Sequence, residues 1–342
     1  MKIVYTDDHR AHFPQGEVYG GELVTPFERP SRVEYILREL KSRKMNDFVA
    51  PGALKMQTVK KVHDKDFVAF LESAWSEWTK AGYRGEILPT MFPVPGLRKK
   101  PMRAIDGKVG YYTFGTETMI TAGTWKAATA SAATALKGQA LVSRGERAAF
   151  ALCRPPGHHA HHDLYGGYCF LNNVAIAAQG FRDAGAKRVA ILDVDFHHGN
   201  GTQDIFYDRE DVLFCSLHGQ PEDTFPYFLG FKDETGRGKG EGFNVNYPMP
   251  PGTKYDVWGA ALEAACRKIK AYKPDVLLVS LGVDTFKNDP ISSFKLESAD
   301  FTTYGARIAK LKLPTLFVME GGYAIDAIGI NTVNVLDGFE NG

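Results

Sequence analysis

The chain has 342 residues, of which 44% are hydrophobic and 12% aromatic, so it can build a sizeable core and is not a disordered protein. Its 41 basic and 40 acidic side chains give a net charge of +1, which leaves no global field to gather nucleic acid or an anionic membrane. Residues 1–8 carry acids where a secretory signal needs an apolar stretch, and no segment approaches the ~18 apolar residues of a membrane span. We therefore expect a cytoplasmic enzyme that binds neither nucleic acid nor membrane.

Short apolar runs predict strands covered on both faces, because they lack the alternation of a half-exposed strand. These runs lie at 2–6, 148–153, 188–194, 212–217, 243–247, 275–281 and 315–319. Amphipathic stretches predict helices at 31–44, 64–80, 123–137, 172–184, 255–272 and 299–311, with Ser31 and Asp64 as N-caps. The alternation predicts a single α/β domain over 1–342, with a mostly parallel central sheet of about eight strands flanked by helices on both faces.

Two segments and the cysteines stand apart from this alternation. Segment 82–121 is rich in proline and glycine and carries a basic run at 98–100, so we expect a functional or interface loop with a solvated basic face. Segment 229–242 is glycine-rich with mixed charges, which favours a mobile surface loop. The cysteines have no Cys-x-x-Cys spacing, and we expect reduced thiols, largely buried, at Cys153, Cys169, Cys215 and Cys266.

Four of the predicted strands are each followed by polar side chains of kinds used in catalysis. In parallel α/β proteins ligands bind at the carboxyl edge of the sheet, so these side chains should meet there. They are the pair His158 and His159, the pair Asp195 and His197, then Asp284, and finally Tyr323.

Residues 193–197 carry the strongest indication of a metal. Side chains two apart on an extended strand share a face, so Asp195 and His197 can converge on one ion, with Asp284 arriving from the strand that ends at Gly282. Asp193 fits a position behind them, orienting an imidazole. Each residue alone could be a cap or a satisfied core group. Burying two carboxylates at one edge without a cation is costly, which favours a divalent metal with an open position.

The histidine pair and the tyrosine suit hydrolysis beside such a metal. A Pro-Pro-Gly turn presents His158 and His159, and two imidazoles facing different acceptors can hold different protonation states, one of them as a general base. Tyr323 follows two glycines, and its hydroxyl can donate a hydrogen bond to an oxyanion. Without a catalytic role, the histidine pair would simply belong to a rigid turn, and Tyr323 to a packed turn. His161 and His162 are expected to be surface residues.

Six segments resemble the zinc-dependent arginase–deacetylase superfamily, and specifically the bacterial acetylpolyamine amidohydrolases. They are CRPPGHHA (153–160), GGYCFLNNVAIAA (166–178), ILDVDFHHGNGTQDIFY (191–207), SLGVDTF (280–286), DPISSFKL (289–296) and MEGGY (319–323). The resemblance runs from Val18 to the C-terminus and implies the arginase–deacetylase fold and hydrolysis of the acetyl amide of acetylputrescine, acetylcadaverine or acetylspermidine.

The resemblance also implies roles for individual residues. It makes Asp195, His197 and Asp284 the ligands of Zn²⁺, a site that Fe²⁺ could also fill. His159 is then the general base and later acid, His158 an electrostatic partner and Tyr323 the electrophilic phenol. The pattern pairs His158 with Asp193 and His159 with Asn200. It further implies a structural K⁺ near the residues Asp193, Ser216 and Leu217, with backbone oxygens of Asp195 and His197.

The substrate side of the site is likewise implied by the resemblance. Tyr168 and Phe225 match the aromatic walls of a tunnel, although core packing would explain them too. Glu117, Asp106 and Glu17 are candidates to pair with distant ammonium groups, against an ordinary reading as solvated carboxylates. Segment 82–121 is expected to form a homodimer contact and to narrow the tunnel, which admits slender polyamines and excludes folded proteins.

Three alternatives remain open at this stage. A deacetylase acting on acetyl-lysine in proteins or peptides would use identical chemistry and differ only in tunnel access. An arginase-like ureohydrolase with two manganese ions needs further carboxylates, where this chain has Gly199 and Phe286. A non-catalytic module that binds acetylated cations would not need the complete set of catalytic side chains.

Overall fold

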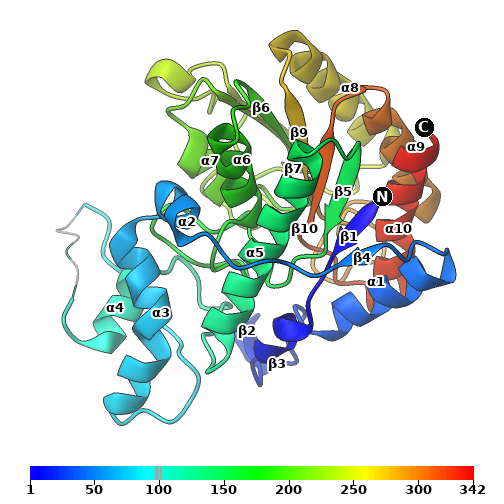
Figure 1. Cartoon of the computed structure of the whole chain (residues 1–342). Coiled ribbons are helices and arrows are strands. Elements are labelled where there is room, and N and C mark those ends of the chain that lie inside the picture. The colour runs from blue at the N-terminus through cyan, green and yellow to red at the C-terminus, as the bar shows by residue number, and fades with distance from the viewer. Residues whose placement is uncertain (97–99, 101) are drawn as a thin grey trace.

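The computed structural model describes residues 1–96, 100 and 102–342, and a parallel eight-stranded sheet lies at its centre (Figure 1). The strand order is β4-β1-β5-β10-β9-β6-β7-β8, with every neighbouring pair parallel. Its strands are Lys2–Val4 (β1), Phe48–Val49 (β4), Ala148–Ala151 (β5), Val189–Asp193 (β6), Val212–Gly219 (β7), Asn244–Met249 (β8), Val276–Leu281 (β9) and Thr315–Met319 (β10). Glu17–Tyr19 (β2) and Glu22–Val24 (β3) form a separate antiparallel hairpin.

Helices cover both faces of this sheet (Figure 1). One face packs against Ser31–Ser42 (α1), Tyr255–Tyr272 (α8), Ser298–Ala309 (α9) and Ile325–Asn341 (α10). The other packs against Thr124–Ser143 (α5) and Asn173–Asp183 (α6), and its apolar cluster continues into Met56–Val62 (α2), Lys65–Lys80 (α3), Ile105–Tyr111 (α4) and Asn200–Phe206 (α7). Short 3₁₀ turns lie at Asp7–Ala11 and Gly238–Gly240. No helix in the described part of the chain is long and apolar enough to cross a membrane.

Strand β10 shows why the strand sequences lack alternation. Leu316 and Val318 belong to the apolar cluster beneath α5 and α6, whereas Phe317 and Met319 belong to the cluster beneath α1 and α8–α10. Successive side chains point to opposite faces, and both faces are covered, so all four positions from Leu316 to Met319 are apolar. The predicted α/β class and parallel sheet are confirmed, and the four cysteines are buried with free thiols.

All seven predicted strands and six predicted helices are present, but several elements were not predicted. Edge strand β4 has only two residues, and α2, α4 and α7 have seven residues each, too short for a clear period. Helix α10 buries Asn331, Thr332 and Asn334 beside apolar residues, so it shows no one-sided apolar stripe. Asp64 caps α3 as expected, but Ser31 is wrong as an N-cap, because α1 begins after Pro30 without a side-chain cap.

The two predicted loops are more ordered than their composition indicates. Within 82–121, Ile87 and Ile120 pair through two backbone hydrogen bonds, and helix α4 packs against α3 (Figure 1). Residues 98 and 99 of the predicted basic run lie outside the described residues. In 229–242, the Glu234 carboxylate accepts hydrogen bonds from Gln203 Nε2 and Gly230 N, so the segment is fastened to α7.

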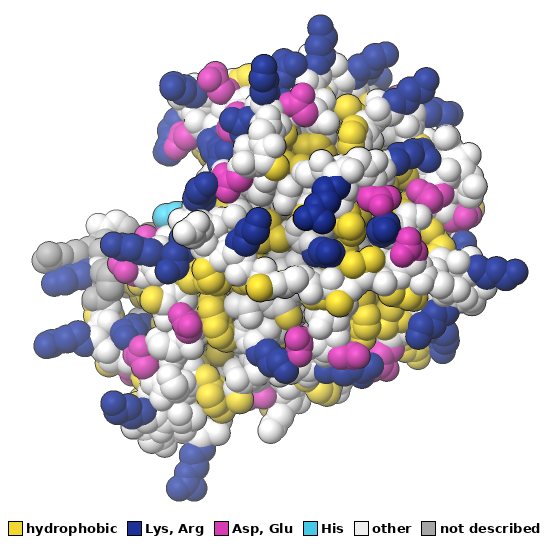
Figure 2. Space-filling model, viewed as in Figure 1, with side chains coloured by type: hydrophobic (Ala, Val, Ile, Leu, Met, Phe, Trp, Pro, Cys, Tyr) yellow, Lys and Arg dark blue, Asp and Glu magenta, His cyan; other side chains and the backbone are white. Residues whose placement is uncertain are grey.

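Basic and acidic side chains are interspersed over the face shown in Figure 2, in keeping with the net charge of +1.

Candidate active site

The predicted catalytic side chains meet at the carboxyl edge of four adjacent strands. β5, β10, β9 and β6 are neighbours in the sheet, and their ends lead to the histidine pair, Tyr323, Asp284 and the 195–197 segment. Parallel pairing brings these ends to one edge, although they come from positions far apart in the chain. The sheet order therefore assembles the site.

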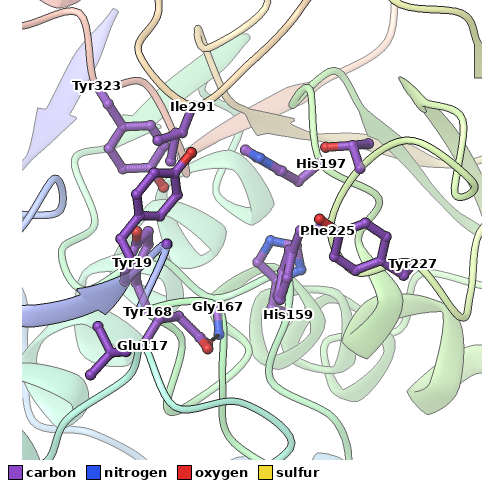
Figure 3. Close-up of a pocket in the computed structure, with 13 residues that line it drawn as sticks. Tyr19, Glu117, His159, Gly167, Tyr168, His197, Phe225, Tyr227, Ile291 and Tyr323 are labelled. Atoms are coloured by element: carbon purple, nitrogen blue, oxygen red, sulfur yellow. Dashed lines mark hydrogen bonds between the residues drawn. The ribbon is translucent and has the colours of Figure 1, made fainter. Parts of the chain in front are cut away.

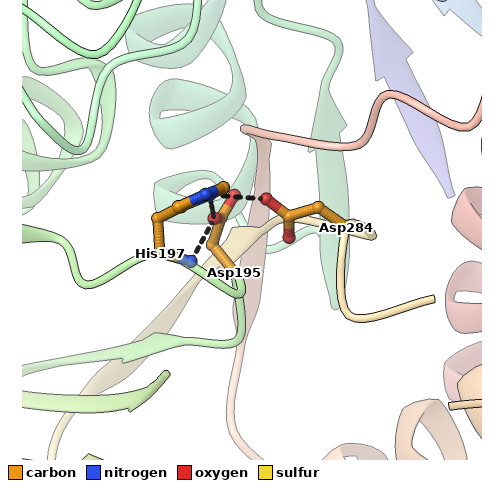
Figure 4. A group of neighbouring side chains, drawn as sticks. All are labelled: Asp195, His197 and Asp284. Carbon is orange, nitrogen blue, oxygen red and sulfur yellow. Dashed lines mark hydrogen bonds and ion pairs between the residues drawn. The ribbon is translucent and has the colours of Figure 1, made fainter. Parts of the chain in front are cut away.

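Asp195, His197 and Asp284 form a compact group of potential metal ligands (Figure 4). All three are buried, and one ligand atom from each lies within 4.8 Å of the other two. His197 Nδ1 is 3.0 Å from Asp284 Oδ2 and 3.4 Å from Asp195 Oδ1. One nitrogen and two carboxylate oxygens thus face a common point.

Backbone N–H groups hold the two carboxylates in place. Asp284 Oδ1 accepts a hydrogen bond from Phe196 N at 2.8 Å, and Asp195 Oδ2 accepts one from Gly321 N at 2.8 Å. Gly321 is required for this approach, because a Cβ there would lie 2.6 Å from an oxygen of each carboxylate. The group is therefore rigid before any ion binds, which favours metal binding without a cost of ordering.

The electrostatics of this group fit a divalent cation. Burial and the nearby Asp195 carboxylate raise the pKa of Asp284 to about 8, because two negative charges cannot share a dry site without compensation. A nitrogen and two oxygens are donors that Zn²⁺ and Fe²⁺ accept, and three protein ligands leave a coordination position for substrate or water. The residues present fit a catalytic metal.

The two neighbouring histidines have different partners. His158 Nδ1 lies 3.0 Å from Asp193 Oδ2, and His159 Nδ1–H donates to Asn200 Oδ1 at 2.6 Å. Burial opposes charging of His158, yet Asp195 and Asp193 outweigh it and raise its pKa to about 10. Burial and the neighbouring His158 and His197 hold the pKa of His159 well below its usual value. The surroundings of the pair thus favour charge on His158 and disfavour charge on His159, whose neutral form can accept a proton.

A cavity of about 260 Å³ opens above the metal ligands. In Figure 3, Tyr323, Ile291, Tyr168 and Tyr19 lie on one side, and His159, His197, Phe225 and Tyr227 lie on the other. The Tyr168 and Tyr323 rings meet edge to face at 5.7 Å between centroids, and the Phe225 ring meets His159 in the same way at 5.0 Å. An alkyl chain threading this cavity would pass between aromatic rings to reach the metal ligands.

The three predicted ammonium-binding acids take different positions. Glu117 lines the cavity, where its Oε1 accepts hydrogen bonds from Gly167 N at 2.6 Å and Thr118 Oγ1 at 2.9 Å. Glu17 is buried behind the wall and accepts from the Tyr168 hydroxyl at 2.9 Å, so it positions Tyr168 and is not brought to the cavity. Asp106 is exposed on α4 and does not line the cavity of its own chain.

The potassium prediction falls on neighbouring buried positions. Asp193 and Ser216 are paired in the register of β6 and β7, and both are buried, as is Leu217. The Asp193 carboxylate also accepts a hydrogen bond from Asp195 N at 3.1 Å, and Ser216 Oγ lies 2.7 Å from His218 Nδ1. Asp193, Ser216 and Leu217 therefore lie together behind the metal ligands.

Three residues that support the site were not singled out from the sequence. Glu320 Oε2 accepts hydrogen bonds from Gly157 N and His158 N at 2.6 and 3.1 Å, which fixes the histidine turn. Asp289 Oδ2 accepts from Tyr323 N at 2.7 Å, and Arg32 donates to Gly322 O at 2.7 Å. Glu320 and Asp289 could have been found as acids within the matched motifs, whereas Arg32 carries no such signal in the sequence.

The prediction that His161 is a surface residue is wrong. Its side chain is 12% exposed and its Nε2 accepts a hydrogen bond from Asn200 Nδ2 at 2.9 Å, because the turn after Ala160 folds back over α7. His162 is 54% exposed, as expected.

Similar proteins agree with this geometry. The sequence matches the histone deacetylase domain over residues 26–339. It is 55% identical over 342 residues to acetylpolyamine amidohydrolase 1 of Pseudomonas aeruginosa, with 99% of each chain covered, and 53% identical over 338 residues to the acetylpolyamine amidohydrolase of Mycoplana ramosa, again with 99% of each covered. The crystal structure of the acetylpolyamine aminohydrolase from Burkholderia pseudomallei superimposes with a TM-score of 0.95 at 36% identity, covering 99% of this chain and 98% of that one.

The chain therefore belongs to the histone deacetylase domain family. Within that family it is similar along its whole length to bacterial proteins named for acetylpolyamine hydrolysis, and it has their arginase–deacetylase fold.

We expect Asp284→Asn to weaken Zn²⁺ binding by more than ~100-fold, because losing a ligand costs more than losing a ligand's hydrogen-bond partner. Asp289→Asn is the matched control, since Asp289 is also buried but holds Tyr323 and lies outside the ligand group. Zinc affinity is measured by competition with a chromophoric chelator. Equal loss of zinc from both variants would contradict the assignment of Asp284.

Proposed function

We propose that this protein hydrolyses the acetyl amide of acetylated polyamines, giving acetate and the free amine. The observation that carries the proposal is the buried Asp195–His197–Asp284 group at the base of an aromatic cavity lined by His159 and Tyr323. The names of the relatives above support the substrate class, and acetylputrescine, acetylcadaverine and acetylspermidine are the expected members.

A Zn²⁺ ion held by Asp195, His197 and Asp284 would supply Lewis-acid chemistry, and the same donor set accepts Fe²⁺. His159 donates Nδ1–H to Asn200, so its Nε2 carries the lone pair and takes a proton as water attacks the acetyl carbon. The Tyr323 hydroxyl stays protonated, because burial raises its pKa well above the usual value, and it donates a hydrogen bond to the oxyanion. His159 then returns the proton to the leaving amine nitrogen as the C–N bond breaks.

The neighbouring His158 has a different role in this reaction. Asp193 favours the protonated form of His158, so His158 would stabilise developing negative charge and would not compete as a base. Tyr168 and Phe225 would grip the alkyl chain of the substrate between their rings, and the carboxylate of Glu117 would meet a distant ammonium group. We further propose a structural K⁺ beside Asp193, Ser216 and Leu217 in the same enzyme.

The rival functions are less well supported. Among the described residues, the group of His, Cys, Asp and Glu side chains that could hold a metal has three members, and Gly199 and Phe286 supply no further carboxylates for a second ion. This favours deacetylation over arginase-like chemistry. Hydrolysis of acetyl-lysine peptides is the second candidate, and it is distinguished by substrate comparison.

Acetylated putrescine, cadaverine and spermidine should be turned over with higher kcat/KM than acetyl-lysine peptides, as measured by acetate release from the zinc-loaded enzyme. Glu117→Gln should raise KM for these cations by roughly 5- to 30-fold, since a charge-assisted contact contributes ~1–2 kcal/mol in a partly solvated site.

An acetylated n-alkylamine without a distant ammonium is the control substrate, and Asp256→Asn, which changes an exposed carboxylate on α8, is the matched control variant. Preference for the peptides would overturn the polyamine assignment. An equal effect of Glu117→Gln on the uncharged substrate would remove Glu117 from ammonium binding.

Tyr323→Phe and His159→Ala should each lower kcat by ~10²–10³ while zinc content and melting temperature stay near the wild-type values, because these side chains stabilise the transition state and bind no metal. Steady-state kinetics with acetylputrescine and metal analysis of the same preparations give both quantities. Full activity in either variant would reject the role assigned to that residue.

We also propose that the chain forms a homodimer through segment 82–121 and the adjoining turn at 225–229. Exposed apolar side chains gather there: Met91, Phe92, Val94 and Phe228 are 68%, 42%, 60% and 87% exposed. Phe92 and Phe228 also line one surface hollow next to the cavity. An apolar cluster of this kind is typical of a protein interface.

Phe228→Ser should weaken dimerisation by about 10- to 100-fold, because burying a phenylalanine contributes ~1.5–3 kcal/mol. Sedimentation velocity over a range of protein concentrations measures the change. Val257→Ser, an exposed apolar position on α8, serves as the control and should leave association unchanged. A wild-type monomer at all concentrations would refute the interface.

A further inference from the structure

His161 occupies a place between two side chains of helix α7. Asn200 and Asp204 are four residues apart, so they project from the same face of α7 one turn apart. The imidazole of His161 lies between them: its Nε2 is 2.9 Å from Asn200 Nδ2, and its Nδ1 is 3.5 Å from Asp204 Oδ2. Asn200 is also the partner of His159.

The hydrogen-bonding capacities of these groups leave one arrangement. An amide nitrogen can only donate, so His161 Nε2 must accept from Asn200 and carries no proton. The ring proton of His161 is then on Nδ1, the nitrogen that faces Asp204. An amide oxygen can only accept, so His159 Nδ1 must carry a proton and His159 Nε2 has the free lone pair.

The ring of His161 is held in this position from several sides. Asp204 Oδ2 also accepts from His162 N at 3.0 Å. Burial alone would raise the pKa of Asp204, but the contacts with His161 and with this N–H hold it below its usual range, so Asp204 is an anion that faces Nδ1 of the ring. The His161 carbonyl lies 2.9 Å from His63 Nδ1, and Phe114 packs edge-on against the ring at 5.4 Å.

We propose that His161 is a positioning residue for the base of the reaction: held by Asp204, it orients the Asn200 amide so that the oxygen faces His159 and fixes the His159 tautomer. This inference rests on the proposed function in one respect, the use of His159 as the base. The orientation of the Asn200 amide depends only on the contacts among the side chains of residues 159, 161, 200 and 204.

The need for such a residue follows from the chemistry of asparagine. An amide offers an acceptor on one side and donors on the other, and the two orientations occupy almost the same space. If the amide turned over, Nδ2–H would face His159 Nδ1, and the His159 proton would move to Nε2. The imidazole would then present N–H to the substrate side and could not accept a proton from water. A carboxylate at position 200 would need no such orientation.

The test compares His161→Leu, which removes the acceptor, with His161→Gln, whose Oε1 can still accept from Asn200. We expect kcat for acetylputrescine to fall by about 10- to 100-fold in His161→Leu, the usual cost of losing an outer partner, with KM changed little. His161→Gln should recover most of the loss. His162→Leu, the exposed neighbour, is the matched control and should keep wild-type kcat.

A double-mutant cycle separates orientation from general support of the turn. With Asn200→Asp, both atoms that can face His159 are acceptors, so His161→Leu should have little further effect on kcat. If His161→Leu caused an equal loss in the wild-type and the Asn200→Asp backgrounds, His161 would merely support the turn, and the proposal would be overturned.

The tautomer is read independently by ¹⁵N NMR of the zinc-loaded protein, with the His159 signals assigned by their loss in His159→Gln. Wild-type protein should show a protonated Nδ1 and an unprotonated Nε2, and His161→Leu should show a mixture. A single unchanged tautomer in His161→Leu would also overturn the proposal. If the wild-type protein turned over no acetylpolyamine, the proposed function would fail while this spectrum still judged the orientation.

Discussion

Two carboxylates, Asp195 and Asp284, are buried at the carboxyl edge of the sheet, and the rest of the site is arranged around them. Their oxygens are held by N–H groups of the 196 and 321 positions and face the nitrogen of His197. Without a cation this much negative charge is unfavourable, as the raised pKa of Asp284 shows. The glycine at 321 is part of the same constraint, because any side chain there would occupy the space of both carboxylate oxygens.

The histidine pair illustrates how environment divides the work between identical side chains. Both rings are buried and their centroids are 4.0 Å apart, yet His158 faces a carboxylate and His159 an amide. The carboxylate favours charge on one ring, and that charge disfavours a second charge next to it. Because the partner of His159 is an amide, the tautomer of His159 depends on which end of Asn200 faces it. The residues that orient Asn200 therefore contribute to catalysis.

Much of this arrangement was accessible from the sequence, since it depends on local pattern. The apolar runs before His158, Asp195, Asp284 and Tyr323 marked strands covered on both faces, and parallel strands deliver their ends to one edge. The motifs indicated the family, which the similarity to whole chains confirms. By contrast, His161 looked like a surface residue, and Glu17 looked like a ligand for ammonium. No pattern indicates that the turn after Ala160 folds back on α7 or that Tyr168 lies in front of Glu17.

By itself, then, the sequence determined the alternation of strands and helices, the chemical kinds of side chain at the strand ends and the spacing of Asp195 and His197, because each depends on residues close together in the chain. Only the tertiary structure decided the order of strands in the sheet, and with it which polar ends became neighbours. It also decided the partners of individual atoms: Glu320 beneath the histidine turn, Asp289 beneath Tyr323 and His161 against Asn200. Each of these hydrogen-bonded pairs joins segments tens to hundreds of residues apart. Whether two such atoms meet depends on shifts of a few ångströms, which the packing of the whole chain sets.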